Sequence, residues 1–136
     1  MKLALLLLAL TSTCICMVTV NIRVHGKLIC SEPFDYKVML WEEDDYHDDF
    51  ISEDKLNGSD ESTTYEVSGK AFDGWFESEV EPRISVQHTC GTEYACFCKE
   101  FGRVGTDSDF SVDFDLEKTN LKSCRACEVA WTMYAE

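Results

Sequence analysis

The chain has 136 residues, 12 of them basic and 26 acidic, which gives a formal net charge of −14. This length predicts one domain, and the acidic balance argues against unaided binding to nucleic acid or anionic lipid, because both need basic side chains. The eight cysteines indicate either a disulfide-bonded secreted domain or a thiolate metal site.

The N-terminal segment has the layout of a secretory signal peptide. Met1-Lys2 gives a short positive start, and an apolar run from Leu3 to Leu10 follows, then small residues. The apolar run is too short to span a bilayer. We therefore expect residues 1–16 to be a signal peptide, cleaved somewhere between positions 13 and 20, and residues 17–136 to be an extracellular domain without a transmembrane segment.

Alternating apolar and polar residues predict short strands along the rest of the chain. The clearest alternations cover residues 20–30, 36–41, 63–68, 82–88 and 110–117, and weaker ones cover 50–56, 97–104 and 129–133. Seven or eight short strands separated by turns predict an all-β antiparallel sandwich of two sheets.

Three glycine-containing segments refine this reading. Gly26 occupies an inward position of the first strand, which predicts the close approach of another backbone. Asn57-Gly58-Ser59-Asp60 predicts a turn. The segment from Lys70 to Glu79 contains glycines and acids, which favour a loop.

An ordered set of motifs resembles a known family. The motifs are VHGKLIC at 24–30, VMLWE at 38–42, YEVSG at 65–69, ISVQHTC at 84–90 and FDL at 114–116. Together they are similar to the transthyretin-like proteins that nematodes secrete. The resemblance implies a transthyretin-type sandwich of two four-stranded sheets.

Six cysteines remain beyond residue 16, and an exported chain is expected to use them in disulfides. They are Cys30, Cys90, Cys96, Cys98, Cys124 and Cys127. A zinc site calls for paired C-x2-C knuckles, but only the last two have that spacing, and Cys96-Phe97-Cys98 is one residue too tight. A redox-active C-x2-C is also disfavoured, because no βαβ pattern surrounds it. We therefore expect no metal site.

Sequence alone does not fix the pairing, and local closeness is our guide. We expect Cys90 to pair with Cys96 or Cys98 across a short connection, and Cys30 to reach the C-terminal pair. The remaining member of Cys96 and Cys98 then takes the other C-terminal cysteine. If these two share a strand, their side chains point the same way and can face one neighbouring segment.

A dense acidic run lies after the second predicted strand. It comprises Glu42, Glu43, Asp44, Asp45, Asp48 and Asp49. Its simplest interpretation is a solvated, self-repelling loop. Clustered carboxylates also suit calcium, although no EF-hand loop is present, or a basic protein partner.

Three histidines are candidates for general acid–base chemistry, because the fold that the resemblance implies also carries a hydrolase of 5-hydroxyisourate. By alternation His25 faces solvent, His88 points inward with Ile84 and Val86, and His47 lies in the acidic run, so we do not expect them to converge. The hydrolase's Tyr-Arg-Gly-Ser C-terminus is also absent. We therefore expect no catalytic residues.

Two further features suit an extracellular protein. Asn57 begins an N-glycosylation sequon in the predicted turn. Phe72, Trp75 and Phe76 place three aromatic rings in one predicted loop, which is a candidate binding surface. Trp41 and Trp131 lie in predicted strands, where packing explains them.

These features together predict a secreted, non-enzymatic binding protein that recognises a small apolar ligand or a cell-surface partner and needs no cofactor. The alternatives are a hydrolase of the 5-hydroxyisourate type, and a structural or host-interaction protein without a discrete ligand.

Overall fold

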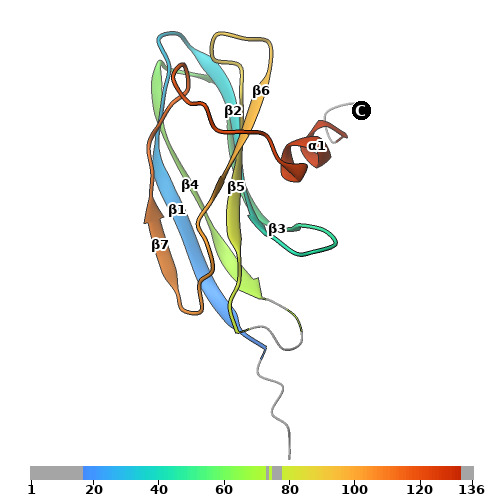
Figure 1. Cartoon of the computed structure of the whole chain (residues 1–136). Coiled ribbons are helices and arrows are strands. Elements are labelled where there is room, and N and C mark those ends of the chain that lie inside the picture. Colours follow the sequence, from blue (N-terminus) through green and yellow to red (C-terminus); the bar gives the residue numbers. More distant parts are fainter. Residues whose placement is uncertain (1–16, 73, 75–77, 133–136) are drawn as a thin grey trace, which may run out of the picture.

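The computed structural model describes residues 17–72, 74 and 78–132, which form two packed β-sheets (Figure 1). The strands are β1 (Thr19–Ile29), β2 (Phe34–Glu42), β3 (Asp49–Ser59), β4 (Ser62–Phe72), β5 (Pro82–His88), β6 (Ala95–Glu100), β7 (Ser108–Ser111) and β8 (Phe114–Asp115), and α1 (Arg125–Thr132) follows them. The predicted all-β, disulfide-bonded sandwich is confirmed.

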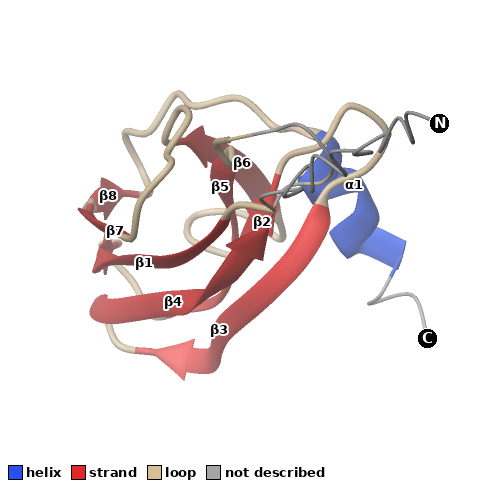
Figure 2. Cartoon of the chain, turned by 90° about the horizontal axis from the view of Figure 1, so that it is seen from below, coloured by secondary structure: helices blue, strands red, loops and turns tan. Residues whose placement is uncertain are grey.

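The first sheet has the order β4-β1-β7, with β8 also paired to β1, and the second has the order β3-β2-β5-β6. All pairs in the second sheet are antiparallel. In the first sheet β1 pairs antiparallel with β4 but parallel with β7 and β8. Seen from below, β3 and β4 run side by side along one margin of the sandwich (Figure 2).

The strand predicted at 110–117 is divided, because the backbone at Val112 crosses over Gly26. A Cβ on Gly26 would lie 2.6 Å from the Val112 carbonyl carbon and 3.0 Å from Asp113 Oδ1. The crossing is fixed by bonds from Val112 N to His25 O (2.9 Å) and from the Tyr65 hydroxyl to Val112 O (2.7 Å). The predicted close approach at Gly26 is confirmed.

The core lies between the sheets and follows the predicted alternation. Val20, Ile22, Val24 and Leu28 of β1 are buried, and they share the cluster with alternate residues of β2, β4 and β5. The disulfide between Cys30 and Cys90 joins the chain after β1 to the chain after β5 and therefore links the two sheets.

A second, smaller apolar cluster lies on the outer face of the second sheet. Met39 and Trp41 of β2 point outward but are buried, together with Ala126 and Cys127 of α1. Disulfides join Cys96 to Cys127 and Cys98 to Cys124. We call Cys96, Cys98, Cys124 and Cys127 the clamp cysteines, because they hold α1 against β6 (Figure 1).

The expected pairing of Cys90 and of Cys30 is therefore wrong. Cys90 belongs to the core between the sheets, whereas Cys96 and Cys98 share the outer face of β6, so the two sets lie on opposite sides of the second sheet. Cys30 meets Cys90 inside the sandwich instead of the C-terminal pair. The expectation that Cys96 and Cys98 face one neighbouring segment is correct.

Three local predictions also change. Residues 129–132 of the strand expected at 129–133 belong to α1, and the segment at 97–104 contributes β6, which ends at Glu100. The predicted turn at 57–60 is mostly the end of β3, and the chain reverses only at Asp60-Glu61. Asn57 and Gly58 together oppose Asp35, which makes a β-bulge, and Gly58 has a φ of 70°.

Candidate functional site

A cleft of about 430 Å³ opens at the end of the second sheet, beside the β5–β6 connection. Its walls come from β2, β3, β5 and that connection, and include Lys37, Asn57, Gln87, Glu93 and Tyr94. The lining combines an aromatic ring with charged and amide groups. Such a surface suits a small molecule that is apolar in part and polar in part.

Gln87 is the unusual residue of this cleft. It is only 3% exposed, and its Nε2 has no hydrogen-bond partner among the residues that the structure describes. Its neighbours in register are Lys37 on β2 and Cys96 on β6. Leaving such a donor unpaired in the interior costs about 1–3 kcal/mol, so a rotation of the Gln87 side chain that brings Nε2 to an acceptor in the cleft would be favoured.

The rim of the cleft is held by hydrogen bonds that centre on Asp35. Its backbone N donates to Thr89 Oγ1 at 2.9 Å, and its carbonyl accepts from Thr89 N at 3.1 Å. One carboxylate oxygen, Oδ1, accepts from Gly58 N at 2.6 Å. These contacts join β2, the β3 bulge and the end of β5, so the site is largely preformed.

Asn57 lies on this rim and is exposed. The sequon's hydroxyl residue, Ser59, is buried, and its Oγ donates to Phe34 O at 2.6 Å. A glycan on Asn57 would therefore leave the protein at the mouth of the cleft.

Part of the acidic run contacts a buried cation of the same chain, Arg83. Arg83 of β5 is 5% exposed and is contacted by Glu43, by Asp48 at 3.5 Å and by Glu100 at 2.9 Å. Glu42 is itself buried, and its Oε1 accepts from Glu81 N at 3.3 Å. Part of the run is thus structural, and Arg83 is the cation it holds.

The rest of the run is more exposed. Asp44 Oδ1 accepts from Asp45 N at 2.6 Å, and Asp49 lies 3.0 Å from His47 Nε2. Within the described residues, no three carboxylates of the run come close enough to share one ion. Binding of calcium or a basic partner stays a prediction.

His25 lies on the outer face of the first sheet, as its alternation predicts. Its Nε2 is 2.9 Å from Asp109 Oδ1, and Arg23 Nη1 is 2.9 Å from the other oxygen of the same carboxylate. Arg23 also bonds Glu66 through Nε at 2.9 Å and Nη2 at 3.1 Å. Hydrogen bonds from Arg23 hold the pKa values of Glu66 and Asp109 below their usual range.

His88 points into the sandwich from the second sheet, so the structure does not bring it together with His25. Its Nδ1 accepts from Cys90 N at 3.1 Å, and its ring packs against the edge of Phe97. Burial lowers the pKa of His88 below its ordinary value. It is a packed histidine with a polar partner, as the alternation indicated.

The aromatic loop is described only in part. Phe72 ends β4 with 55% of its surface exposed, whereas Trp75 and Phe76 lie outside the described residues. Trp41 packs in its strand as predicted, and its Nε1 donates to Ser85 Oγ at 2.9 Å. Trp131 belongs to α1 and not to a strand.

Sequence reasoning missed Gln87, Tyr94 and Arg83 as parts of a site. Gln87 and Arg83 occupy outward positions of β5, where a polar residue normally meets solvent. The signal that was available is the alternation of β5, because Arg83 and Gln87 are out of phase with the core residues Ile84 and Val86. What covers the outer face is decided by α1 and the acidic run, which come from other parts of the chain.

Two comparisons with known proteins complete this description. A model of the transthyretin-like family matches residues 25–104, from the middle of β1 to just beyond β6. No curated protein matches the chain. In the described part of the chain, no helix has the length and apolar character needed to cross a bilayer.

Proposed function

The chain belongs to the transthyretin-like family, and on that premise we propose that it is a secreted, non-enzymatic binding protein whose ligand occupies the cleft beside Gln87. The observation that carries the proposal is the buried Nε2 of Gln87, which has no hydrogen-bond partner among the described residues. Secretion is supported by the three disulfides, because such bonds persist in oxidising compartments.

The lining specifies the ligand's chemistry. A hydrogen-bond acceptor on the ligand, such as a carbonyl oxygen, satisfies Gln87, and an apolar ring or chain packs against Tyr94. The ligand is therefore a small, largely apolar molecule with one well-placed acceptor. Its size is bounded by the volume of about 430 Å³.

The test uses matched pairs of small aromatic compounds, one with a carbonyl acceptor and one without, measured by equilibrium dialysis against the intact protein. Because the Gln87 amide gains a hydrogen-bond acceptor only from the carbonyl compound, the protein should bind that compound more tightly than its partner without the carbonyl. The expected difference is about 1–3 kcal/mol, or roughly 5- to 150-fold in Kd. Gln87→Met keeps the side-chain length and removes the donor, so the preference should vanish.

Ser68→Ala is the matched control, because Ser68 lies on the first sheet, away from this cleft. It should leave both affinities unchanged. The proposal fails if Gln87→Met retains the preference, or if Ser68→Ala abolishes it as well.

The hydrolase alternative retains one supporting observation, the 2.9 Å contact between His25 Nε2 and Asp109, which could orient a general base. An assay with 5-hydroxyisourate decides it. The binding-protein proposal predicts no hydrolysis above the uncatalysed rate. Turnover that is lost in both His25→Ala and His88→Ala would establish the enzyme instead.

A cell-surface partner is the other recognition mode, and the exposed ring of Phe72 is what favours it. Capture from extracellular fluid by the intact protein and by Trp75→Ala tests it, and equal capture of every partner would remove the aromatic loop from consideration.

Glycosylation of Asn57 is read from the mass lost by the secreted protein on enzymatic deglycosylation, with Asn57→Gln as the control.

A further inference from the structure

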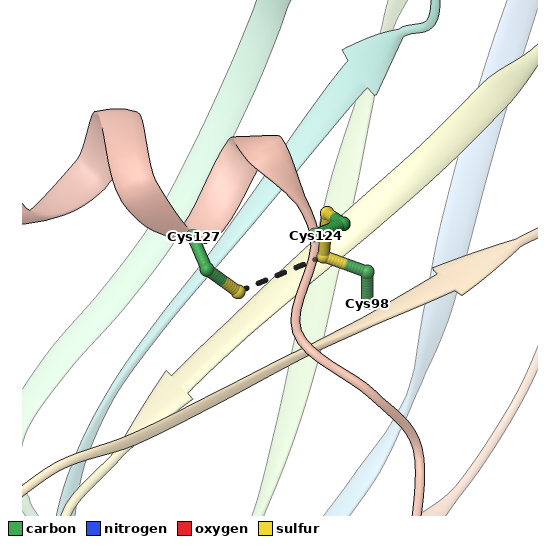
Figure 3. Close-up of side chains that lie close together, drawn as sticks. All are labelled: Cys98, Cys124 and Cys127. Carbon is green, nitrogen blue, oxygen red and sulfur yellow. Dashed lines mark hydrogen bonds between the residues drawn. A yellow bond between two sulfur atoms is a disulfide. The ribbon is translucent and has the colours of Figure 1, made fainter.

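Three of the clamp cysteines, Cys98, Cys124 and Cys127, bring their sulfur atoms together on the outer face of the second sheet (Figure 3). The Sγ atoms of Cys98, Cys124 and Cys127 all lie within 4.8 Å of one another. The fourth sulfur, of Cys96, is bonded to Cys127 and so belongs to the same cluster. Four sulfurs therefore gather from β6 and from the start of α1.

The fold brings two cysteine pairs, one on β6 and one at the start of α1, to face each other. Cys96 and Cys98 alternate with Phe97 on β6 and point to one face, while Cys124 and Cys127 stand one helical turn apart. A C-x-C strand pair thus faces a C-x2-C helix pair. Two such pairs are the ligand set of a four-thiolate metal site.

The sulfur separations fit a tetrahedral ion. Zinc–sulfur bonds of about 2.3 Å at tetrahedral angles place neighbouring sulfurs roughly 3.8 Å apart. The non-bonded contact between Cys98 Sγ and Cys127 Sγ is 3.6 Å. Each bonded pair has Cα atoms about 6.0 Å apart (5.9 and 6.0 Å), so rotation of the side chains lets those sulfurs separate once the bonds are reduced.

Burial and local charge act on the clamp cysteines in opposite directions. Cys98 and Cys127 are buried beside Met39 and Trp41, which disfavours free thiolates but shields a bound metal ion and its sulfurs from water. Cys124 directly precedes α1, whose N-terminal end stabilises negative charge. Lys122 and Arg125 flank it in sequence, and Cys98 N donates to Lys122 O at 2.9 Å.

From this geometry we propose that the reduced chain binds one soft divalent metal ion, such as Zn²⁺, through the four clamp cysteines, so that a metal–thiolate cluster replaces the two disulfides in holding α1 on β6. Two equivalents of a dithiol reductant deliver four electrons and four protons to the two disulfides and become cyclic disulfides. The four thiols then bind the ion and release their four protons. The proposal does not depend on the cleft.

Cobalt(II) is the probe, because tetrahedral thiolate coordination gives it an intense sulfur-to-metal charge-transfer absorption. The intact chain is reduced with a dithiol, freed of excess reductant without air, and titrated with Co²⁺. We expect one Co²⁺ per chain, displaced by one equivalent of Zn²⁺, and a rise in Tm on loading. The oxidised chain should show none of this absorption.

Two double variants separate the clamp from cysteine content in general. Cys30→Ser with Cys90→Ser removes the other disulfide and should still bind one ion. Cys98→Ser with Cys124→Ser removes one sulfur from each side and should lose at least about tenfold in affinity, together with the four-sulfur absorption.

Three results would overturn the proposal. The first is a six-coordinate cobalt spectrum or less than one ion per chain. The second is unchanged binding in the clamp double variant. The third is equal affinity in concentrated guanidinium, because a site built by the fold must weaken when the fold is lost.

Discussion

Replacing Gly26 with alanine tests the backbone crossing that divides β7 from β8. The added Cβ would lie 2.6 Å from the Val112 carbonyl carbon, whereas ordinary contact begins at 3.4 Å. The crossing segment must therefore retreat by about 1 Å, since its obstacle is backbone and not a flexible side-chain end.

The magnitude follows from the bonds that such a retreat breaks. Three hydrogen bonds hold the crossing, from Val112 N to His25 O at 2.9 Å, from the Tyr65 hydroxyl to Val112 O at 2.7 Å and from Lys27 N to Asp113 Oδ1 at 2.8 Å. At about 1 kcal/mol each, their loss lowers the free energy of unfolding by about 3 kcal/mol. That corresponds to a fall of about 10 °C in Tm for a domain of this size.

The assay is equilibrium unfolding in urea with the disulfides intact, followed by near-ultraviolet circular dichroism. Tyr65→Phe removes one of the three bonds and should cost about 1 kcal/mol. Gly69→Ala is the matched control, because the nearest atom to its Cβ is the Cγ2 methyl of Ile51 and not backbone, so rotation of the Ile51 side chain can relieve the contact and we expect a smaller loss of about 1 kcal/mol. A Gly26→Ala protein within about 0.5 kcal/mol of the wild type would refute the reasoning.

Other predictions follow from the disulfides and the buried charges. Cys30→Ser with Cys90→Ser opens a loop spanning 60 residues and should lower the unfolding free energy by about 4 kcal/mol in the same assay. Arg83→Met leaves the buried Asp48 without its cation and should lower the free energy of unfolding by about 3 kcal/mol. Adding Asp48→Asn should restore part of this loss, and equal stability of the single and the double variant would contradict the prediction. Burial lowers the pKa of His88 in the folded state, so protonation of this residue favours the unfolded chain. Its contribution to the free energy of unfolding is therefore full above pH 6.5 and is lost as the pH falls below that value, by at most about 1.4 kcal/mol per pH unit. His88→Asn should flatten that part of the stability–pH curve, and an unchanged curve would exclude His88 as its cause.

Much of the fold was predictable because strand alternation is local. In β1 and β4 alternate residues are buried and the others more exposed, so the sequence reports both the strand and its core-facing side. Gly26 likewise stood out because it occupies a core-facing position of the first strand but has no side chain, and the structure places the backbone of Val112 against it.

Alternation does not predict exposure in β5, because all seven of its residues are buried. Arg83 and Gln87 point away from the core, as alternation predicts, yet they do not meet solvent as ordinary outward residues do. Glu43 and Asp48 cover Arg83, and the clamp holds α1 over the same face. Alternation assigns a residue to a face of its sheet, but what covers that face depends on distant segments.

The cysteines show where sequence and tertiary structure divide. By itself the sequence determined an all-β sandwich with disulfides, because composition and alternation need no knowledge of distant contacts. Only the tertiary structure decided the pairing, because Cys90 and Cys96 are close in sequence but lie on opposite faces of one sheet. It also decided that α1 forms where a strand was predicted, since the helical turn between Cys124 and Cys127 brings both sulfurs to β6.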